Sequence, residues 1–81
     1  MDRHDVVATI REVAVEILGI EPGIIIETTR FKEDLEADSL DLVELVMGIE
    51  DRFDISVPEE DLEGVTTIGQ AVDLVLAKMG S

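Results

Sequence analysis

The sequence predicts an all-α fold: a small four-helix bundle of three longer helices and one short helix, with a long first loop. Three segments place apolar residues at the three- and four-residue spacing of an amphipathic helix. Only one segment resembles a strand, and the chain offers no second strand to pair with it. With 81 residues, the chain is long enough for one domain, residues 1–81. Its core should be aliphatic, because Phe31 and Phe53 are the only aromatic residues.

The first helix is expected over residues 5–18, where aliphatic residues recur on one face and Gly19 provides the C-terminal stop. The connection that follows, residues 19–38, is long and contains the turn signal Pro22-Gly23. Ile24-Ile25-Ile26 alone resembles a short strand. Because it has no pairing partner, we expect a loop whose alternate residues enter the core.

The second long helix is expected over residues 39–53, with Asp38 as N-cap and Asp41 as its capping-box partner. A short helical turn should follow, with Pro58 at its first position. The last helix begins at Thr67-Ile68-Gly69-Gln70, which matches the T-x-x-Q capping box. On the helix over residues 39–53, the buried face is expected to consist of Leu42, Leu45, Val46, Ile49 and Phe53. On the last helix, it is expected to consist of Ile68, Ala71, Val72, Val75, Leu76 and Met79.

The chain is strongly acidic, with 20 acidic and six basic residues and a formal net charge of −14. Residues 33–63 hold 13 of the acids and a single base, Arg52. Such a surface repels nucleic acid and anionic membranes, so we expect neither as a partner and instead expect enzymes with basic patches. No apolar run approaches the ~20 residues of a membrane span, and the N-terminus lacks a signal-peptide layout. We therefore expect a cytoplasmic monomer.

Catalytic and metal-binding patterns fail on inspection. The chain has no Cys, which excludes disulfides, thiolate metal sites and a thiol nucleophile from the polypeptide. The single His, His4, lies in a polar N-terminal stretch without rigid support, so we do not expect it to be a catalytic base. The D-x-E-x-D pattern from Asp34 resembles the start of an EF-hand, but Ser39 and Leu45 stand where Gly and Glu are needed. No metal site is expected.

A second apolar row lies on the helix over residues 39–53, apart from its core stripe. Leu40, Val43 and Met47 follow the spacing i, i+3 and i+7, with carboxylates interleaved. A surface helix rarely needs a second apolar row, so this pattern favours a docking face with apolar contacts and charges for steering. The alternative is that these three side chains pack beneath the long loop.

Asp38-Ser39-Leu40 marks the junction of loop and helix, and alone it says little, because Asp and Ser are common at helix starts. Residues 38–47 as a whole, DSLDLVELVM, resemble the carrier signature of bacterial fatty-acid-synthesis acyl carrier proteins. One departure stands out, since many relatives have Gly where this chain has Glu36. The similarity extends through Phe31-x-x-Asp34-Leu35, Glu50 to Asp54, Val57 to Glu60, Thr66 to Ile68 and Ala71-Val72, and covers nearly the whole chain.

The resemblance implies that Ser39 carries phosphopantetheine through a phosphodiester and that Asp38 assists the phosphopantetheinyl transferase. The protein would be a carrier without catalysis of its own, passing acyl intermediates as thioesters between enzymes of fatty acid biosynthesis. The resemblance also implies a partner-binding set: Leu40, Asp41, Val43, Glu44, Met47, Glu50, Glu59, Glu60 and Glu63. Together with the core stripes, it implies an acyl pocket lined by Leu42, Val46, Ile49, Leu62, Val65 and Ala71.

Two other functions stay open. A carrier protein of a polyketide or other lipid-tailoring pathway would share most of this signature. Ala37-Asp38-Ser39-Leu40 and the acidic second helix favour the fatty-acid type over peptidyl carriers, which usually have glycines before the serine. A helical interaction protein without any arm is the remaining alternative. The mass of the protein after incubation with coenzyme A and a transferase distinguishes it from both carriers.

Overall fold

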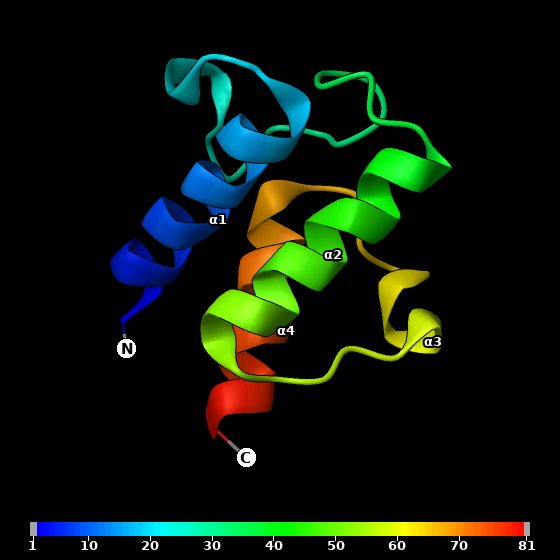
Figure 1. Cartoon of the computed structure of the whole chain (residues 1–81). Coiled ribbons are helices and arrows are strands. Elements are labelled where there is room, and N and C mark those ends of the chain that lie inside the picture. Colours follow the sequence, from blue (N-terminus) through cyan, green and yellow to red (C-terminus); the bar gives the residue numbers. More distant parts are fainter. Residues whose placement is uncertain (1, 81) are drawn as a thin grey trace.

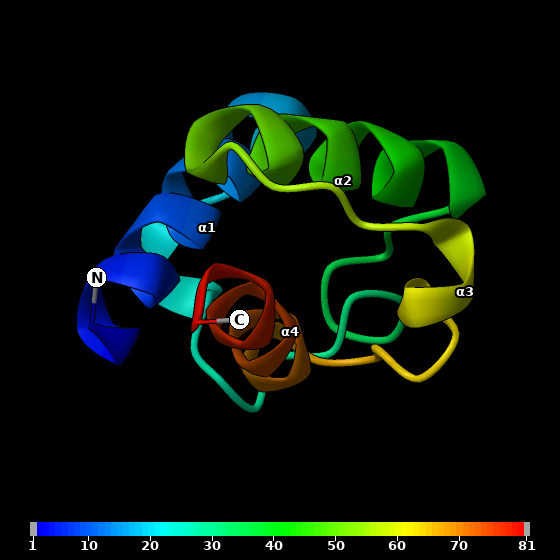
Figure 2. The ribbon, with the colours of Figure 1, turned by 90° about the horizontal axis from the view of Figure 1, so that it is seen from below.

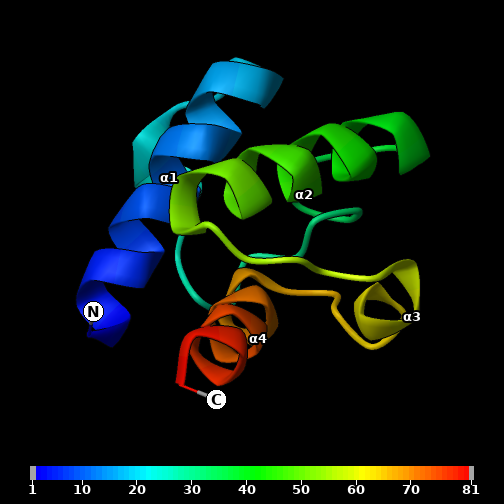
Figure 3. The same ribbon diagram turned by 60° about the horizontal axis from the view of Figure 1, so that its bottom comes forward.

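The computed structural model describes residues 2–80 and has the predicted all-α architecture. Its helices are α1 (Arg3–Leu18), α2 (Ser39–Phe53), α3 (Glu59–Leu62) and α4 (Ile68–Gly80), joined as Figure 1 shows. α1 packs closely against both α2 and α4. α3 lies on the side of α2 and α4 away from α1 (Figures 2 and 3). The predicted arrangement of three longer helices and one short helix is confirmed.

The start and end of α1 are set by two flanking residues. The Asp2 carboxylate accepts a hydrogen bond of 3.0 Å from the backbone N–H of Asp5, which satisfies one free donor of the first turn. Gly19 adopts φ 66° and donates its N–H to the Val15 carbonyl, a left-handed C-cap. The predicted stop is therefore correct. The helix starts at Arg3, two residues earlier than expected, because Asp2 serves as its N-cap.

The long first loop contains a single 3₁₀ turn, η1 (Pro22–Ile24), and no strand. Ile25 is completely buried, whereas Ile24 and Ile26 are about half exposed. The Thr29 hydroxyl fixes this turn: it donates to the Ile24 carbonyl at 2.7 Å and accepts from the Ile26 N–H at 3.0 Å. The expectation of a loop with alternating burial is confirmed, with one of the three isoleucines in the core.

The aliphatic core is densest where α1 meets α2 and α4. Val6, Ile10 and Ala14 have no exposed surface. At Gly48 of α2, an added Cβ would lie 2.8 Å from Cγ1 of Val13, so the missing side chain permits the close approach of α1 and α2. The predicted core holds except at partly buried Leu42, Val46 and Leu76 and at exposed Met79, which lies in the last turn of α4.

Two arginines, Arg3 and Arg52, form ion pairs between α1 and segments that are distant in the sequence. Arg3 of α1 pairs with Glu27 of the long loop and, at 2.6 Å, with Asp73 of α4. Arg52 at the end of α2 pairs with Glu12 and Glu16 of α1, each at 3.2 Å. All of these groups are partly or largely exposed, so each pair contributes little to the free energy of unfolding.

The connection between α2 and α3 begins at Asp54, which closes α2 in a left-handed conformation with φ 54°. α3 starts at Glu59, so the prediction of Pro58 as its first residue was wrong by one position. Pro58 instead takes the extended conformation that precedes the helix. Among residues 2–80, no helix is long and apolar enough to cross a membrane.

Candidate functional site: the start of α2 and an apolar cavity

Ser39 is the first residue of α2, and its side chain is exposed. Its hydroxyl forms no hydrogen bond within the part of the chain that the structure describes. The predicted capping box fixes the backbone on either side: the Asp38 carboxylate accepts from the Asp41 N–H at 2.9 Å, and the Asp41 carboxylate accepts from the Asp38 N–H at 3.3 Å. The site thus presents an accessible hydroxyl on a rigidly defined helix start.

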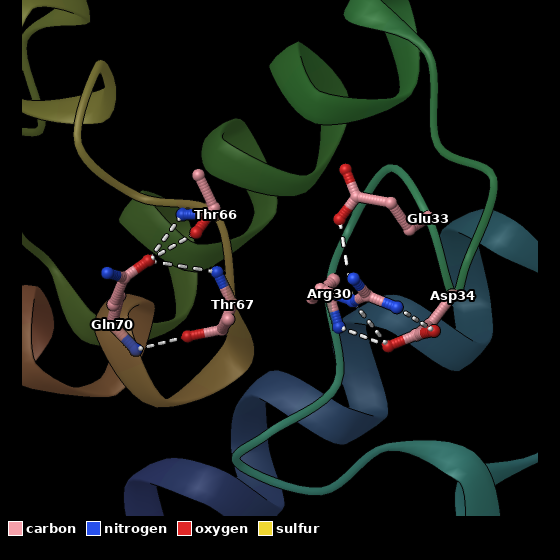
Figure 4. A network of polar contacts seen from close by, with 6 residues as sticks. All are labelled: Arg30, Glu33, Asp34, Thr66, Thr67 and Gln70. Atoms are coloured by element: carbon pink, nitrogen blue, oxygen red, sulfur yellow. Dashed lines mark hydrogen bonds and ion pairs between the residues drawn. The ribbon is translucent and has the colours of Figure 1, made fainter.

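The loop before Ser39 is held against the connection between α3 and α4. The Phe31 N–H donates to the Thr66 carbonyl at 3.0 Å, and Arg30 and Thr67 form an isolated antiparallel bridge. Figure 4 shows the polar groups around this contact. The Arg30 backbone N–H and then its guanidinium donate to Asp34, which lowers the pKa of that carboxyl below its usual value.

The other half of this contact is the start of α4. The Gln70 side-chain carbonyl accepts hydrogen bonds from the Thr67 N–H at 3.1 Å and the Thr66 N–H at 2.6 Å. In return, the Thr67 hydroxyl accepts from the Gln70 N–H at 3.2 Å (Figure 4). The capping box predicted from T-x-x-Q is confirmed. It fixes the connection between α3 and α4, against which the loop before Ser39 packs.

Glu36 adopts a left-handed backbone conformation with φ 54°. A residue with a Cβ is strained in this region, whereas glycine is not. Its neighbours Leu35 and Ala37 are both buried while Glu36 is exposed, so their packing holds the turn in place. The departure noted in the sequence therefore lies at a position where the backbone favours glycine.

An apolar cavity of about 70 Å³ lies between α2, α3 and α4. All six residues predicted for the acyl pocket line it, and every other lining residue is also apolar. The sequence analysis missed five of these. Leu45 and Val75 were assigned to the core stripes, and Leu74 is a further residue of α4. Phe31 and Val57 come from loops, whose course helical periodicity does not define.

A second hollow of about 210 Å³ shares four apolar residues with the cavity: Phe31, Leu42, Leu62 and Val65. Its remaining lining residues are polar or charged, so this hollow adjoins the apolar cavity on a side that carries polar groups, and we refer to it as the mouth. Leu42 lies three residues after Ser39 and therefore on the same face of α2. Leu42, a lining residue of the mouth, therefore lies about one helical turn from Ser39. The polar lining residues are Lys32, Glu33, Glu63 and Thr66.

The second apolar row of α2 is exposed. Leu40, Val43 and Met47 each keep more than half of their surface accessible, so the alternative that they pack beneath the long loop is wrong. Glu44 lies exposed among them and makes no hydrogen bond or ion pair to any described residue. The exposed row is the physical form expected of a docking face.

The other residues of the predicted partner-binding set differ in their surroundings. Glu50 is partly buried, and its carboxylate accepts a hydrogen bond of 2.9 Å from the Val57 N–H, so it holds the connection to α3. Asp41 serves in the capping box. Glu59, Glu60 and Glu63 are exposed on or just after α3.

The residues excluded as catalytic lie apart from this site. His4 is exposed in the first turn of α1. Within residues 2–80, no group of three or more His, Cys, Asp or Glu side chains is arranged to hold a metal ion.

Comparison with known proteins agrees with this geometry. Residues 8–75 match the family described as Phosphopantetheine attachment site. Acyl carrier protein of Rubrobacter xylanophilus is 43% identical over 76 residues, which cover 94% of both chains. Acyl carrier protein of Prochlorococcus marinus is 41% identical over 80 residues, 99% of this chain and 100% of the relative. Acyl carrier protein of a Sulfurovum species is 46% identical over 66 residues, 82% and 88% of the two chains.

The chain therefore belongs to the phosphopantetheine attachment family and, within it, to the acyl carrier proteins. Its cofactor is phosphopantetheine, as the resemblance implied. The residues at the start of α2 fit such a group, because the Ser39 hydroxyl is exposed and makes no hydrogen bond to any described residue, and Leu42 one turn further on lines an apolar cavity.

Proposed function

We propose that the protein carries acyl intermediates as thioesters on phosphopantetheine attached to Ser39 and passes them between the enzymes of fatty acid biosynthesis. One observation carries the proposal: Ser39, with its exposed and unbonded hydroxyl, lies on α2 one helical turn before Leu42, which lines the apolar cavity and its mouth. The prosthetic group supplies the thiol for the thioester, which the chain itself lacks because it contains no Cys. In this role the protein is a carrier and not an enzyme.

The cavity gives the carrier a place for cargo out of water. Its lining is apolar throughout, so each buried methylene of a chain would gain about 0.8 kcal/mol before losses. At about 70 Å³ it has roughly half the volume of cavities of ~150 Å³ that admit benzene. We infer that short chains fit with little change and that longer chains require the lining helices to move apart.

The test of the attachment site compares two exposed serines, Ser39 and Ser56. Each is replaced by Ala, and the intact mass is measured after incubation with coenzyme A and a phosphopantetheinyl transferase. We expect wild type and Ser56→Ala to gain one arm, and Ser39→Ala to gain none while keeping the wild-type melting temperature. An arm on Ser39→Ala would contradict the site.

We propose that partner enzymes bind the exposed row of α2, with Glu44 among the steering charges. Opposite charges across an interface mainly raise the association rate. Reversing Glu44 to Lys should therefore slow association with a basic partner, and raising the salt concentration should slow the wild type by the same route. Glu21→Lys is the matched control, because Glu21 is also exposed but lies beside η1. Equal effects of both reversals would mean that only net charge matters.

A carrier role in polyketide or other lipid-tailoring synthesis is the alternative pathway. The mass of the protein isolated from its native cells distinguishes the two, because it reports the cargo on the arm. A monomeric state is favoured by the net charge of −14, which repels a second copy. The cytoplasmic location remains a prediction from the sequence.

A further inference from the structure

Lys32 has an unusual environment for a basic residue in so acidic a protein. It makes no hydrogen bond or ion pair within the part of the chain that the structure describes. The other five basic residues are all engaged. One of them, Arg11, donates a hydrogen bond to the backbone carbonyl of Ile25. The other four form ion pairs with carboxylates: Arg3, Arg30, Arg52 and Lys78. An exposed lysine that pairs with none of 20 acids is free to bind a ligand.

The position of Lys32 is more specific than its exposure. It lines the mouth of the cavity and is the one basic residue among the described residues that line it. Of the two carboxylates that line the same mouth, Glu33 already pairs with Arg30 at 3.5 Å, and Glu63 follows α3. The neighbouring Phe31 backbone is bonded to Thr66, so Lys32 extends from a held segment of the loop.

We propose that Lys32 binds the phosphodiester of the arm on Ser39 and thereby directs the arm across the mouth toward the cavity; this inference rests on the proposed function. Ser39 lies one helical turn before Leu42, which lines the mouth, and before Val43 of the exposed row, so a substituent on Ser39 leaves the helix at the edge of the face that borders the mouth. The phosphodiester is the one charged group of such an arm, and an ammonium group binds a phosphate oxygen strongly through a charge-assisted hydrogen bond.

The test uses Lys32→Gln and Lys32→Arg, each with and without the arm, and intact mass establishes whether the arm is attached. Phosphorus NMR then reads the phosphodiester directly. We expect its resonance to shift in Lys32→Gln relative to wild type and to stay near the wild-type position in Lys32→Arg. Raising the salt concentration should move the wild-type resonance toward that of Lys32→Gln and leave the variant unchanged.

Melting temperatures distinguish a contact with the arm from a merely structural role. We expect Lys32→Gln to lower the melting temperature of the protein with the arm by about 2 to 4 °C and to leave the unmodified protein unchanged. An equal loss in both forms, or a phosphorus resonance identical in wild type and Lys32→Gln, would overturn the contact alone. A wild-type protein that gains no mass would overturn the proposed function and this inference with it.

Discussion

The two sides of the bundle differ in how they are packed. On the α1 side, fully buried side chains such as Ile10 meet α2 and α4, and the contact at Gly48 leaves no room even for a Cβ. On the α3 side, a helix of four residues without a single buried residue borders a cavity. We therefore expect the α1 side to supply most of the stability, whereas the α3 side contains the empty space that we propose for cargo.

The difference also determines which part of the molecule can open. An isolated helix of four residues is unstable in water, so α3 depends on its contacts with the rest of the protein. These include Leu62 at the cavity and the ion pair of Asp61 with Lys78 at 2.7 Å. Segments with few buried contacts open at a low free energy while the core stays folded. If the proposed acyl pocket is correct, opening at α3 would admit a chain while the α1 side stays folded.

The largest expected effect comes from truncating one apolar side chain on each side. Ile10→Ala, at a completely buried position of α1, should lower the free energy of unfolding by about 3 to 4 kcal/mol. Leu62→Ala should lower it by about 1 kcal/mol, because Leu62 is partly exposed and already borders empty space. Urea denaturation of the unmodified protein measures both. Equal losses would contradict the division between the two sides.

An attached acyl chain should stabilise the α3 side, and the stabilisation should increase with the length of the chain until the cavity is full. The net charge of −14 opposes compaction, so burial of a chain adds noticeably to a small stability margin. We expect the melting temperature to rise from short to medium saturated chains and then level off, with a net gain on the order of 1 to 3 kcal/mol after ordering losses.

Ile49→Phe is the matched variant for this series, because Ile49 lines the cavity and a larger side chain there should fill it. In this variant the melting temperature should no longer depend on the length of the acyl chain, although the chain is attached to the arm as in the wild type. A wild-type series that is already flat would show that the chain stays in solvent, whatever is attached to Ser39.

The ion pair of α3 provides a smaller and more local test. Asp61→Asn removes one charge that Lys78 contacts, and since both groups are about one-third exposed, this pair is worth at most about 1 kcal/mol. Amide hydrogen exchange in α3 should accelerate about twofold to fivefold, with no change in α1. Asp73→Asn is the control, because Asp73 makes a comparable ion pair with Arg3 on the other side. Equal acceleration of α3 in both variants would contradict a local role.

Most of the fold was predictable because its signals are local. The helical periodicity and the two capping boxes predicted the elements, and the same stripes located six residues of the cavity. The loop contributions were not predictable, since Phe31 and Val57 reach the cavity only through tertiary contacts. Nor does spacing reveal that Glu50 accepts a hydrogen bond from the Val57 N–H, or that Lys32 makes no hydrogen bond or ion pair to any residue from 2 to 80. These depend on how the loops pack and not on any repeat in the sequence.

A comparably small effect is expected at Glu36 in the loop before Ser39. Relief of its left-handed strain by Glu36→Gly should gain about 1 to 2 kcal/mol, from which the extra freedom of glycine in the unfolded chain removes about 0.4 to 1 kcal/mol. The net result is a rise in melting temperature of a few degrees.

Glu63→Gly is the control for Glu36→Gly, because Glu63 is also exposed but has an ordinary φ of −57°. There the substitution relieves nothing, so the cost of glycine should appear alone as a lower melting temperature. Opposite signs for the two variants would show that the turn at Glu36 is strained. A fall in both would mean that the buried neighbours Leu35 and Ala37 hold this turn without measurable strain at Glu36.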